Sequence, residues 1–124
     1  EALEVLDFLS LQHLANEYAG NLSTGQKKLL ELARTLMAKP KMVLLDEPSA
    51  GVNPSLMNVL TEDIRRSCQD KGITFLLIEH DMNLVMDLCN PVVVMSNGTT
   101  LAEGTPQEIR TNPEVVSAYL RGPS

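Results

Sequence analysis

The stretch Asn21-Leu-Ser-Thr-Gly-Gln26 stands at the start of a helical pattern, and the rest of the chain is organised around it. Ser23 is a suitable N-cap residue, and Gln26 follows three residues later, as in a capping box. Apolar side chains then recur at helical spacing, at Leu29, Leu32, Ala33 and Leu36. Pro40 helps to end the helix. The sequence therefore predicts a capped amphipathic helix between Ser23 and Pro40.

A short apolar run, Met42-Val-Leu-Leu45, follows this helix and predicts a buried strand. It ends in two adjacent carboxylates, Asp46 and Glu47, and then Pro48. The bland interpretation is a carboxylate pair that caps the next turn. Charge at the mouth of a core strand is costly, however, and usually serves a metal or a proton.

A second helix and a second strand repeat this arrangement further along the chain. Asn53-Pro54 provides an N-cap and a proline at the first helical position, and Lys71-Gly72 ends the helix. Residues 73–78 then form another apolar run, which ends in Glu79-His80. A histidine at such a place is more often structural, but here it follows a strand end that matches the one at Asp46.

These motifs together resemble the ATP-binding-cassette (ABC) ATPases. Leu22–Gln26 is similar to the signature motif of that family, and Met42–Glu47 is similar to its Walker B strand with the catalytic glutamate. Ser49–Asn53 resembles the D-loop, and Ile78–Asp81 resembles the strand end with the switch histidine. Four motifs in the family's order and approximate spacing form a specific signal.

The finer resemblance is to the ATP-binding subunits of branched-chain amino-acid importers, through Leu77–Met82 and Ala102–Pro106. No glycine in the chain is followed by lysine, so the phosphate-binding Walker A loop would lie upstream of Glu1. The resemblance implies an α/β fold, an incomplete P-loop NTPase core with a mostly parallel sheet flanked by helices and without the Walker A strand. Residues 1–40 would be the end of the helical subdomain and the signature helix, and residues 41–124 the C-terminal part of the ATPase core. Together they would make one partial ABC domain.

The resemblance also implies a role for individual residues toward ATP and Mg²⁺. Glu47 would orient or deprotonate the attacking water, and His80 would contact the γ-phosphate; these are the expected catalytic residues. Asp46 would act at the metal. The expected nucleotide-contacting residues are Leu22, Ser23, Thr24, Gly25, Gln26 and Asn53.

Two of these positions depart from the family pattern. Thr24 stands where the family usually has glycine, and Asn53 replaces the usual aspartate at the end of the D-loop. From the residues alone, a helix cap and nothing more is the favoured interpretation of Ser23 to Gln26. With the downstream motifs, a phosphate contact is favoured, because a helix N-terminus presents unpaired N–H groups and Gly25 lets the backbone approach closely.

Composition limits the classes of partner. The net charge of −6 and an aromatic content of 3% disfavour nucleic-acid binding, and with it an ABC protein of DNA repair or translation. No apolar run approaches the roughly 20 residues of a membrane helix. The resemblance implies a cytoplasmic protein held at the inner face of the membrane by permease subunits and paired with a second nucleotide-binding domain. Cys68 and Cys89 have no metal-ligand spacing.

The sequence thus predicts an ATP-binding and ATP-hydrolysing subunit of an importer, in the form of a fragment without Walker A. The alternative is a catalytically inert fragment that acts only in folding or dimerisation. In the family the Walker A strand lies between the strands expected near residues 74–78 and 92–95. Its absence would leave a slot in the sheet, and we expect the fragment to associate with itself there rather than to close the slot.

Overall fold

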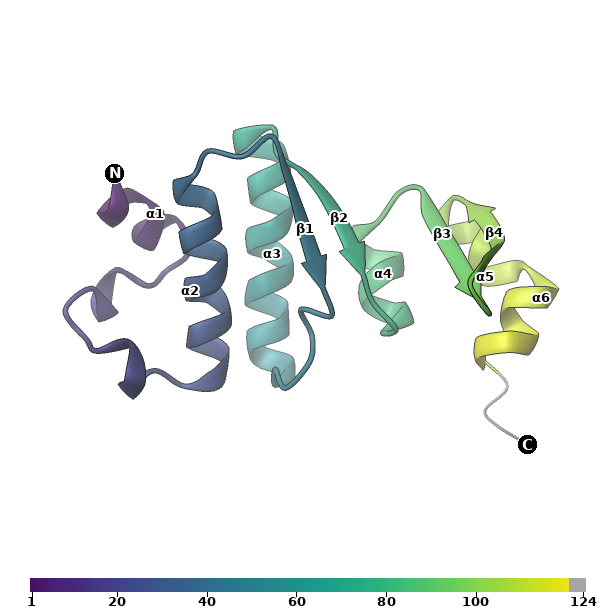
Figure 1. Ribbon diagram of the computed structural model, residues 1–124, viewed down its shortest axis with the longest axis horizontal. Helices are drawn as coiled ribbons and strands as arrows, with labels where there is room; N and C mark the ends of the chain where they lie inside the picture. Colours follow the sequence, from purple (N-terminus) through teal and green to yellow (C-terminus); the bar gives the residue numbers. More distant parts are fainter. Residues whose placement is uncertain (121–124) are drawn as a thin grey trace. The chain divides into compact units, whose positions relative to one another are not determined.

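The computed structural model describes residues 1–120, and these residues fall into two compact units. The first unit is Glu1–Glu79, and the second begins at His80. Figure 1 labels their helices and strands. The division expected after residue 40 falls inside the first unit and stays a prediction.

The first unit begins with a helical half. It contains α1 (Ala2–Phe8), two short 3₁₀ turns, η1 (Gln12–Leu14) and η2 (Ala19–Asn21), and the long helix α2 (Thr24–Met37). α1 packs against α2. The predicted apolar face of α2 is buried, and so are two leucines that follow α1; these residues are Leu9, Leu11, Leu29, Leu32, Ala33 and Leu36.

The other half of the first unit is a β–α–β element. Strands β1 (Met42–Asp46) and β2 (Thr74–Ile78) pair in parallel and are joined by α3 (Pro54–Lys71). Helices α2 and α3 run side by side along this strand pair (Figure 1). Because the strands are parallel, their C-terminal ends meet at one edge, where Asp46 lies opposite Ile78. This confirms the α/β class and the expected pairing of the two strands that end in acidic residues.

The two faces of the β1–β2 pair differ in exposure. Val43 is buried, and Leu45 is half-buried. The alternate positions carry exposed apolar side chains: Met42, Leu44, Leu76 and Ile78. Parallel sheets normally have both faces covered. The first unit therefore presents an uncovered apolar sheet face beside its acidic edge.

The second unit is a helix followed by an antiparallel hairpin and three short helical pieces. Its elements are α4 (Met82–Leu88), β3 (Val92–Ser96), β4 (Thr99–Gly104), α5 (Pro106–Thr111), α6 (Pro113–Val115) and a π turn, η3 (Val116–Leu120). Its core consists of Val92, Val94, Ile109 and Val115. The predicted hairpin turn is confirmed, with Asn97 and Gly98 at φ values of +48° and +77°. β3 and β4 form a two-stranded sheet of their own.

Candidate functional site

The signature residues form the capped N-terminus of α2. Ser23 Oγ accepts a hydrogen bond from Gln26 N at 3.2 Å, and Ser23 N donates to Gln26 Oε1 at 2.9 Å. The predicted capping box is therefore confirmed. The first turn of α2 carries no acidic residue, and Lys27 follows it directly. A helix N-terminus with a neutral cap and an adjacent lysine favours an anion.

At Gly25 the helix α2 lies close against Leu56 of α3. A Cβ atom built on Gly25 would lie 1.5 Å from Leu56 Cδ2 and 3.0 Å from Leu56 Cγ. Gly25 is buried. Packing against Leu56 is thus a sufficient physical reason for a glycine here, beside the expected approach to a phosphate, which stays a prediction.

The loop between β1 and α3 lies beside this helix start. Gly51 is in the left-handed region, with φ at +72°, and a Cβ built on it would lie 4.0 Å from Thr24 Cγ2. Asn53 caps α3, because its side chain accepts from Leu56 N at 3.0 Å. The fold therefore brings the signature residues and the D-loop residues together within the first unit. Leu22 is half-buried just before the cap.

The two predicted acidic residues lie at the C-terminal edge of the strand pair. Asp46 and Glu47 are both exposed, whereas Pro48 is buried. Glu47 has a φ of +47°, which is uncommon for a residue other than glycine. Its backbone N–H donates to Ile78 O at 2.8 Å. The carboxylates are therefore presented to solvent from a backbone that is fixed by the neighbouring strand.

The predicted catalytic histidine lies in the second unit. His80 is exposed and is the first residue of that unit. Asp81 next to it caps α4, accepting from Asn83 N at 2.9 Å and Leu84 N at 3.3 Å. The cap on α4 was predicted from the sequence. The γ-phosphate contact expected of His80 stays a prediction.

Glu79 is a residue to which the sequence analysis gave no role. Its carboxylate accepts a hydrogen bond from Ser49 N at 2.8 Å, 30 residues away in the chain. The bond joins the end of β2 to the start of the D-loop. The only sequence signal was an acidic residue directly after an apolar strand, which is also what Asp46 shows.

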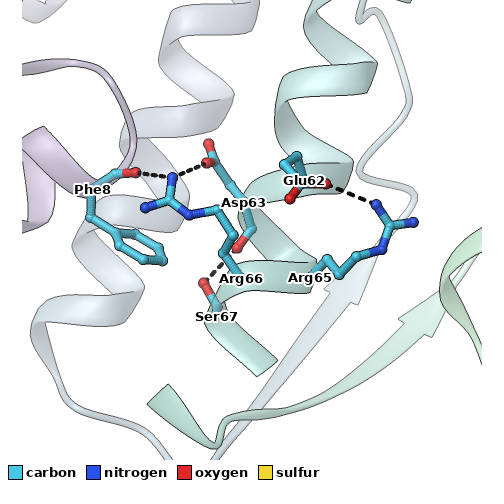
Figure 2. A network of polar contacts seen from close by, with 6 residues as sticks. All are labelled: Phe8, Glu62, Asp63, Arg65, Arg66 and Ser67. Carbon is cyan, nitrogen blue, oxygen red and sulfur yellow. Dashed lines mark hydrogen bonds and ion pairs between the residues drawn. The ribbon is translucent and has the colours of Figure 1, made fainter. Parts of the chain in front are cut away.

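A second feature missed by the sequence analysis is a partly buried polar network between α1 and α3 (Figure 2). Arg66 NH1 donates to Phe8 O at 3.0 Å and lies 3.7 Å from Asp63 Oδ1. The guanidinium also lies over the Phe8 ring, 4.3 Å from its centroid. Ser67 Oγ donates to Asp63 O at 2.7 Å. This network attaches the end of α1 to α3.

Asp63 is the buried and incompletely hydrogen-bonded member of that network. Its residue is 4% exposed, and its Oδ2 has no hydrogen-bond partner within the part of the chain described. Burial raises the pKa of Asp63 to about 6, against the opposing effect of Arg66. Burying a carboxylate with one unsatisfied oxygen lowers the stability of the folded state. The network therefore attaches α1 to α3 but also destabilises the fold at Asp63.

Two cavities border the first unit's helices and strands. One of about 210 Å³ lies along α2 and β1 and reaches Asp46 and Pro48. A larger one, of about 600 Å³, is lined by residues at the opposite end of the strands, including Lys39, Pro40 and Ile73. Ligands of open α/β sheets bind beyond the C-terminal strand ends. We therefore place the candidate site at Asp46 and Glu47, not at the larger cavity.

The candidate site supplies part of the donor set that MgATP, the cofactor implied by the resemblance, requires. Asp46 offers one exposed carboxylate of the kind that Mg²⁺ prefers, and the start of α2 offers N–H groups suited to phosphate. Residues 1–120 contain no group of three or more acidic, histidine or cysteine side chains arranged to hold a metal ion. The residues present fit part of a MgATP site. No helix in the described range has the length and apolar character needed to cross a membrane.

Comparison with known proteins agrees with this geometry. Residues 1–50 match the sequence model of the family "ABC transporter", and residues 99–120 match that of "Branched-chain amino acid ATP-binding cassette transporter". The fold, with its parallel strand pair and capped helix start, matches part of an ABC ATPase cassette. A crystal structure of an ATP-binding cassette of an ABC transporter in its ADP conformation matches with a TM-score of 0.86 and 41% identity, covering 97% of this chain and 48% of that one.

Curated relatives narrow the resemblance. The high-affinity branched-chain amino acid transport ATP-binding protein BraF of Pseudomonas aeruginosa is 45% identical over 115 residues, which cover 93% of this chain and 45% of the relative. The probable branched-chain amino acid transport ATP-binding protein LivG of Archaeoglobus fulgidus is 42% identical over 120 residues, covering 97% and 46%. The chain spans about half the length of the curated relatives it matches. It is thus a homologue of ABC transporter ATP-binding subunits, specifically of those named for branched-chain amino acids.

Proposed function

We propose that this chain is the signature- and Walker B-bearing part of an ATP-hydrolysing subunit of an ABC importer for branched-chain amino acids. The observation that carries the proposal is the shared edge of β1 and β2, which presents Asp46 and Glu47 to solvent beyond a parallel strand pair. The two relatives' names and the match at residues 99–120 support the choice of solute.

In this proposal each residue has a separate task. Asp46 holds the Mg²⁺ ion, which when bound supplies positive charge that offsets the phosphate charge. Glu47 orients the attacking water and accepts its proton. The helix start at Ser23 to Gln26 contacts the phosphate of a nucleotide held by a second nucleotide-binding domain, and Thr24 and Asn53 border that contact.

His80 contacts the γ-phosphate, and the complete protein works with permease subunits at the cytoplasmic face of the membrane.

A fold of this kind needs a Walker A segment for its principal phosphate contacts. The chain as printed therefore neither binds MgATP tightly nor hydrolyses it. Isothermal titration calorimetry of the chain with MgATP checks this, and a micromolar dissociation constant would contradict it.

The activity itself is tested in an extended protein, defined as this chain preceded by the Walker A-bearing half of an ABC ATP-binding subunit. We expect ATP hydrolysis, loss of hydrolysis in Glu47→Gln with ATP binding retained, and loss in His80→Ala. Phosphate release and nucleotide titration measure the two quantities. An extended protein that folds and binds ATP but does not hydrolyse it would refute the proposed function.

The second candidate function is self-association of this chain, and the uncovered face of β1 and β2 favours it. Leu44 is 68% exposed and Ile78 is 58% exposed, on neighbouring strands. Apolar patches of this kind mark interaction surfaces. We expect a dimer or larger species in size-exclusion chromatography with light scattering, and dissociation in Leu44→Glu. A monomer at high concentration would refute this candidate.

A further inference from the structure

The turn that follows β1 holds Glu47 in a backbone conformation that its sequence disfavours. Its φ of +47° lies in the left-handed region, where residues other than glycine are uncommon. The next residue is Pro48, and a residue before proline favours an extended conformation. Such a conformation persists only where surrounding contacts impose it.

Two hydrogen bonds from the end of β2 supply those contacts. Glu47 N donates to Ile78 O, and Ser49 N donates to Glu79 Oε1, each at 2.8 Å. Pro48 between them has no N–H group to donate. The end of β2 therefore accepts from the N–H group on each side of the proline. The first acceptor is a backbone carbonyl that any residue would supply, whereas the second depends on the side chain of Glu79.

The consequences extend from Ser49 into the D-loop. Ala50 N donates to Glu47 O and Val52 N donates to Ser49 O, both at 3.1 Å. Gly51 within this turn lies next to Thr24. Glu79 is half-buried, so its carboxylate reaches Ser49 from a partly desolvated position where an ionic acceptor is stronger than in water. A shift at Ser49 would thus move Glu47 on one side and the loop beside the signature residues on the other.

We propose that Glu79 is a positioning residue, whose carboxylate fixes the turn carrying Glu47 and the start of the D-loop through the N–H of Ser49. This inference rests on the proposed function, because it assigns Glu79 a share in the hydrolytic role of Glu47. Glu79 acts through the backbone of residues 47–49 and has no contact with nucleotide in this assignment.

Two substitutions at Glu79 and one at Ser49 separate positioning from general stability. Glu79→Ala removes the acceptor, and Glu79→Gln keeps an acceptor oxygen at the same place without the charge. Ser49→Ala keeps the backbone N–H and is the matched control for the hydrogen bond. Hydrogen exchange is followed at the amide of residue 49, in the chain as printed and in the extended protein. We expect exchange to rise about tenfold in Glu79→Ala, less in Glu79→Gln, and to stay unchanged in Ser49→Ala.

Kinetics of the extended protein give the second readout. We expect Glu79→Ala to lower kcat about tenfold while the KM for ATP stays within about twofold, because the turn is displaced but the principal phosphate contacts are not. Glu79→Gln should recover most of the loss. Glu103→Ala, which removes an exposed carboxylate from β4, should leave kcat unchanged.

The outcomes that overturn the inference are distinct from those that overturn the proposed function. Unchanged exchange at residue 49 in Glu79→Ala would refute the hydrogen bond as the cause of positioning. Faster exchange with an unchanged kcat would refute its importance for hydrolysis. Absence of hydrolysis in the unsubstituted extended protein would refute the proposed function, and residue 49 exchange would still decide whether Glu79 holds the turn.

Discussion

Helices α2 and α5 both begin with a capping box, but the box is neutral in α2 and contains a carboxylate in α5. In α2, Ser23 pairs with Gln26, which is neutral, and the first turn has no acidic residue. In α5, Thr105 pairs with Glu108, whose Oε2 accepts from Thr105 N at 2.7 Å and from Thr105 Oγ1 at 2.9 Å. Those bonds lower the pKa of Glu108.

The comparison shows that a capping box does not by itself make a phosphate site. The helix start of α5 already has a carboxylate of its own, so its partial positive charge is satisfied within the chain. The helix start of α2 has no acidic side chain in its first turn, and Lys27 lies beside it, so its partial positive charge is not offset by a carboxylate of its own. The two boxes differ at the third helical residue, which is glutamine in α2 and glutamate in α5, and we predict that this difference determines whether the helix start can bind phosphate.

The largest expected effect is that of making α2 resemble α5 by the substitution Gln26→Glu. Glutamate at this position preserves the capping box, so the helix should fold as before. Its charge would face the phosphate of the nucleotide, and two like charges about 4 Å apart near a protein surface repel by about 4 kcal/mol. We expect hydrolysis by the extended protein to fall about 1,000-fold, the factor that corresponds to about 4 kcal/mol.

The reverse change in α5, Glu108→Gln, is the matched control and should leave hydrolysis unaltered. Steady-state phosphate release measures both variants, and circular dichroism verifies that both fold. Full activity in Gln26→Glu would mean that the start of α2 is only a cap, the simpler of the two interpretations of these residues.

The carboxylate of Asp63 sharpens the contrast because Asp63 is buried, whereas Glu108 is exposed. Burial raises the pKa of Asp63 to about 6, above the usual value for an unfolded chain. A raised acid pKa in the folded state means that stability from this group is full below about pH 4 and is lost as pH rises through about 6. We expect the free energy of unfolding to fall by about 2 kcal/mol across that window, and Asp63→Asn to remove most of the fall.

Urea denaturation at several pH values between 4 and 7 provides the measurement for Asp63. Asp70→Asn is the matched control, because Asp70 is another acid on α3 but is exposed. A stability profile for Asp63→Asn that parallels the unsubstituted chain would contradict the raised pKa.

The third prediction concerns two glycines, Gly25 within the α2 capping box and Gly104 directly before the α5 capping box. A Cβ on Gly25 would lie 1.5 Å from Leu56 Cδ2, and a Cβ on Gly104 would lie 2.8 Å from Glu108 Oε2. Leu56 has to move for Gly25→Ala, which should cost about 1–2 kcal/mol of unfolding free energy. Gly104→Ala should cost less, because its nearest neighbour atom lies 2.8 Å away instead of 1.5 Å and belongs to an exposed side chain.

Chemical denaturation compares the two glycine variants. The double variant Gly25→Ala/Leu56→Ala should be more stable than the sum of the two single effects predicts, since truncation of Leu56 makes room for the added methyl group. Strict additivity would show that the Gly25–Leu56 contact is not the cause.

Local features of this fold could be predicted from the sequence because their causes are local. Capping boxes, the Asn53 cap with Pro54 behind it, Gly72 in the left-handed conformation and the turn at Asn97-Gly98 each depend on residues within a few positions of one another. The parallel pairing of β1 and β2 was predicted through the family resemblance, and it is confirmed.

The features that the sequence analysis missed are contacts between distant residues. The Glu79–Ser49 bond spans 30 residues, and the Arg66–Phe8 bond spans 58. No periodicity or spacing marks either of them. Gly25 was predicted for its backbone freedom, whereas the structure gives it a packing contact with Leu56 as well. The roles of Asp46, Glu47 and His80 toward ATP stay predictions.

The smallest expected effect is a difference between the two capping boxes in how the stability lost on removing the N-cap oxygen depends on pH. Ser23→Ala and Thr105→Ala each remove an N-cap oxygen and should each cost about 1 kcal/mol at pH 7. The cost at Ser23 should be the same at pH 4, because its partner Gln26 does not titrate. The pKa of Glu108 is lowered in the folded state, so the stability it contributes is present above its unfolded pKa and is lost as pH falls through the folded value. The cost of Thr105→Ala should therefore shrink in acid, where the protonated Glu108 no longer accepts strongly from residue 105.

Urea titrations of both variants at pH 7 and at pH 3.5–4 give the comparison. Parallel behaviour of the two variants would mean that the charge of Glu108 contributes nothing to the α5 cap, and that the two helix starts are electrostatically alike.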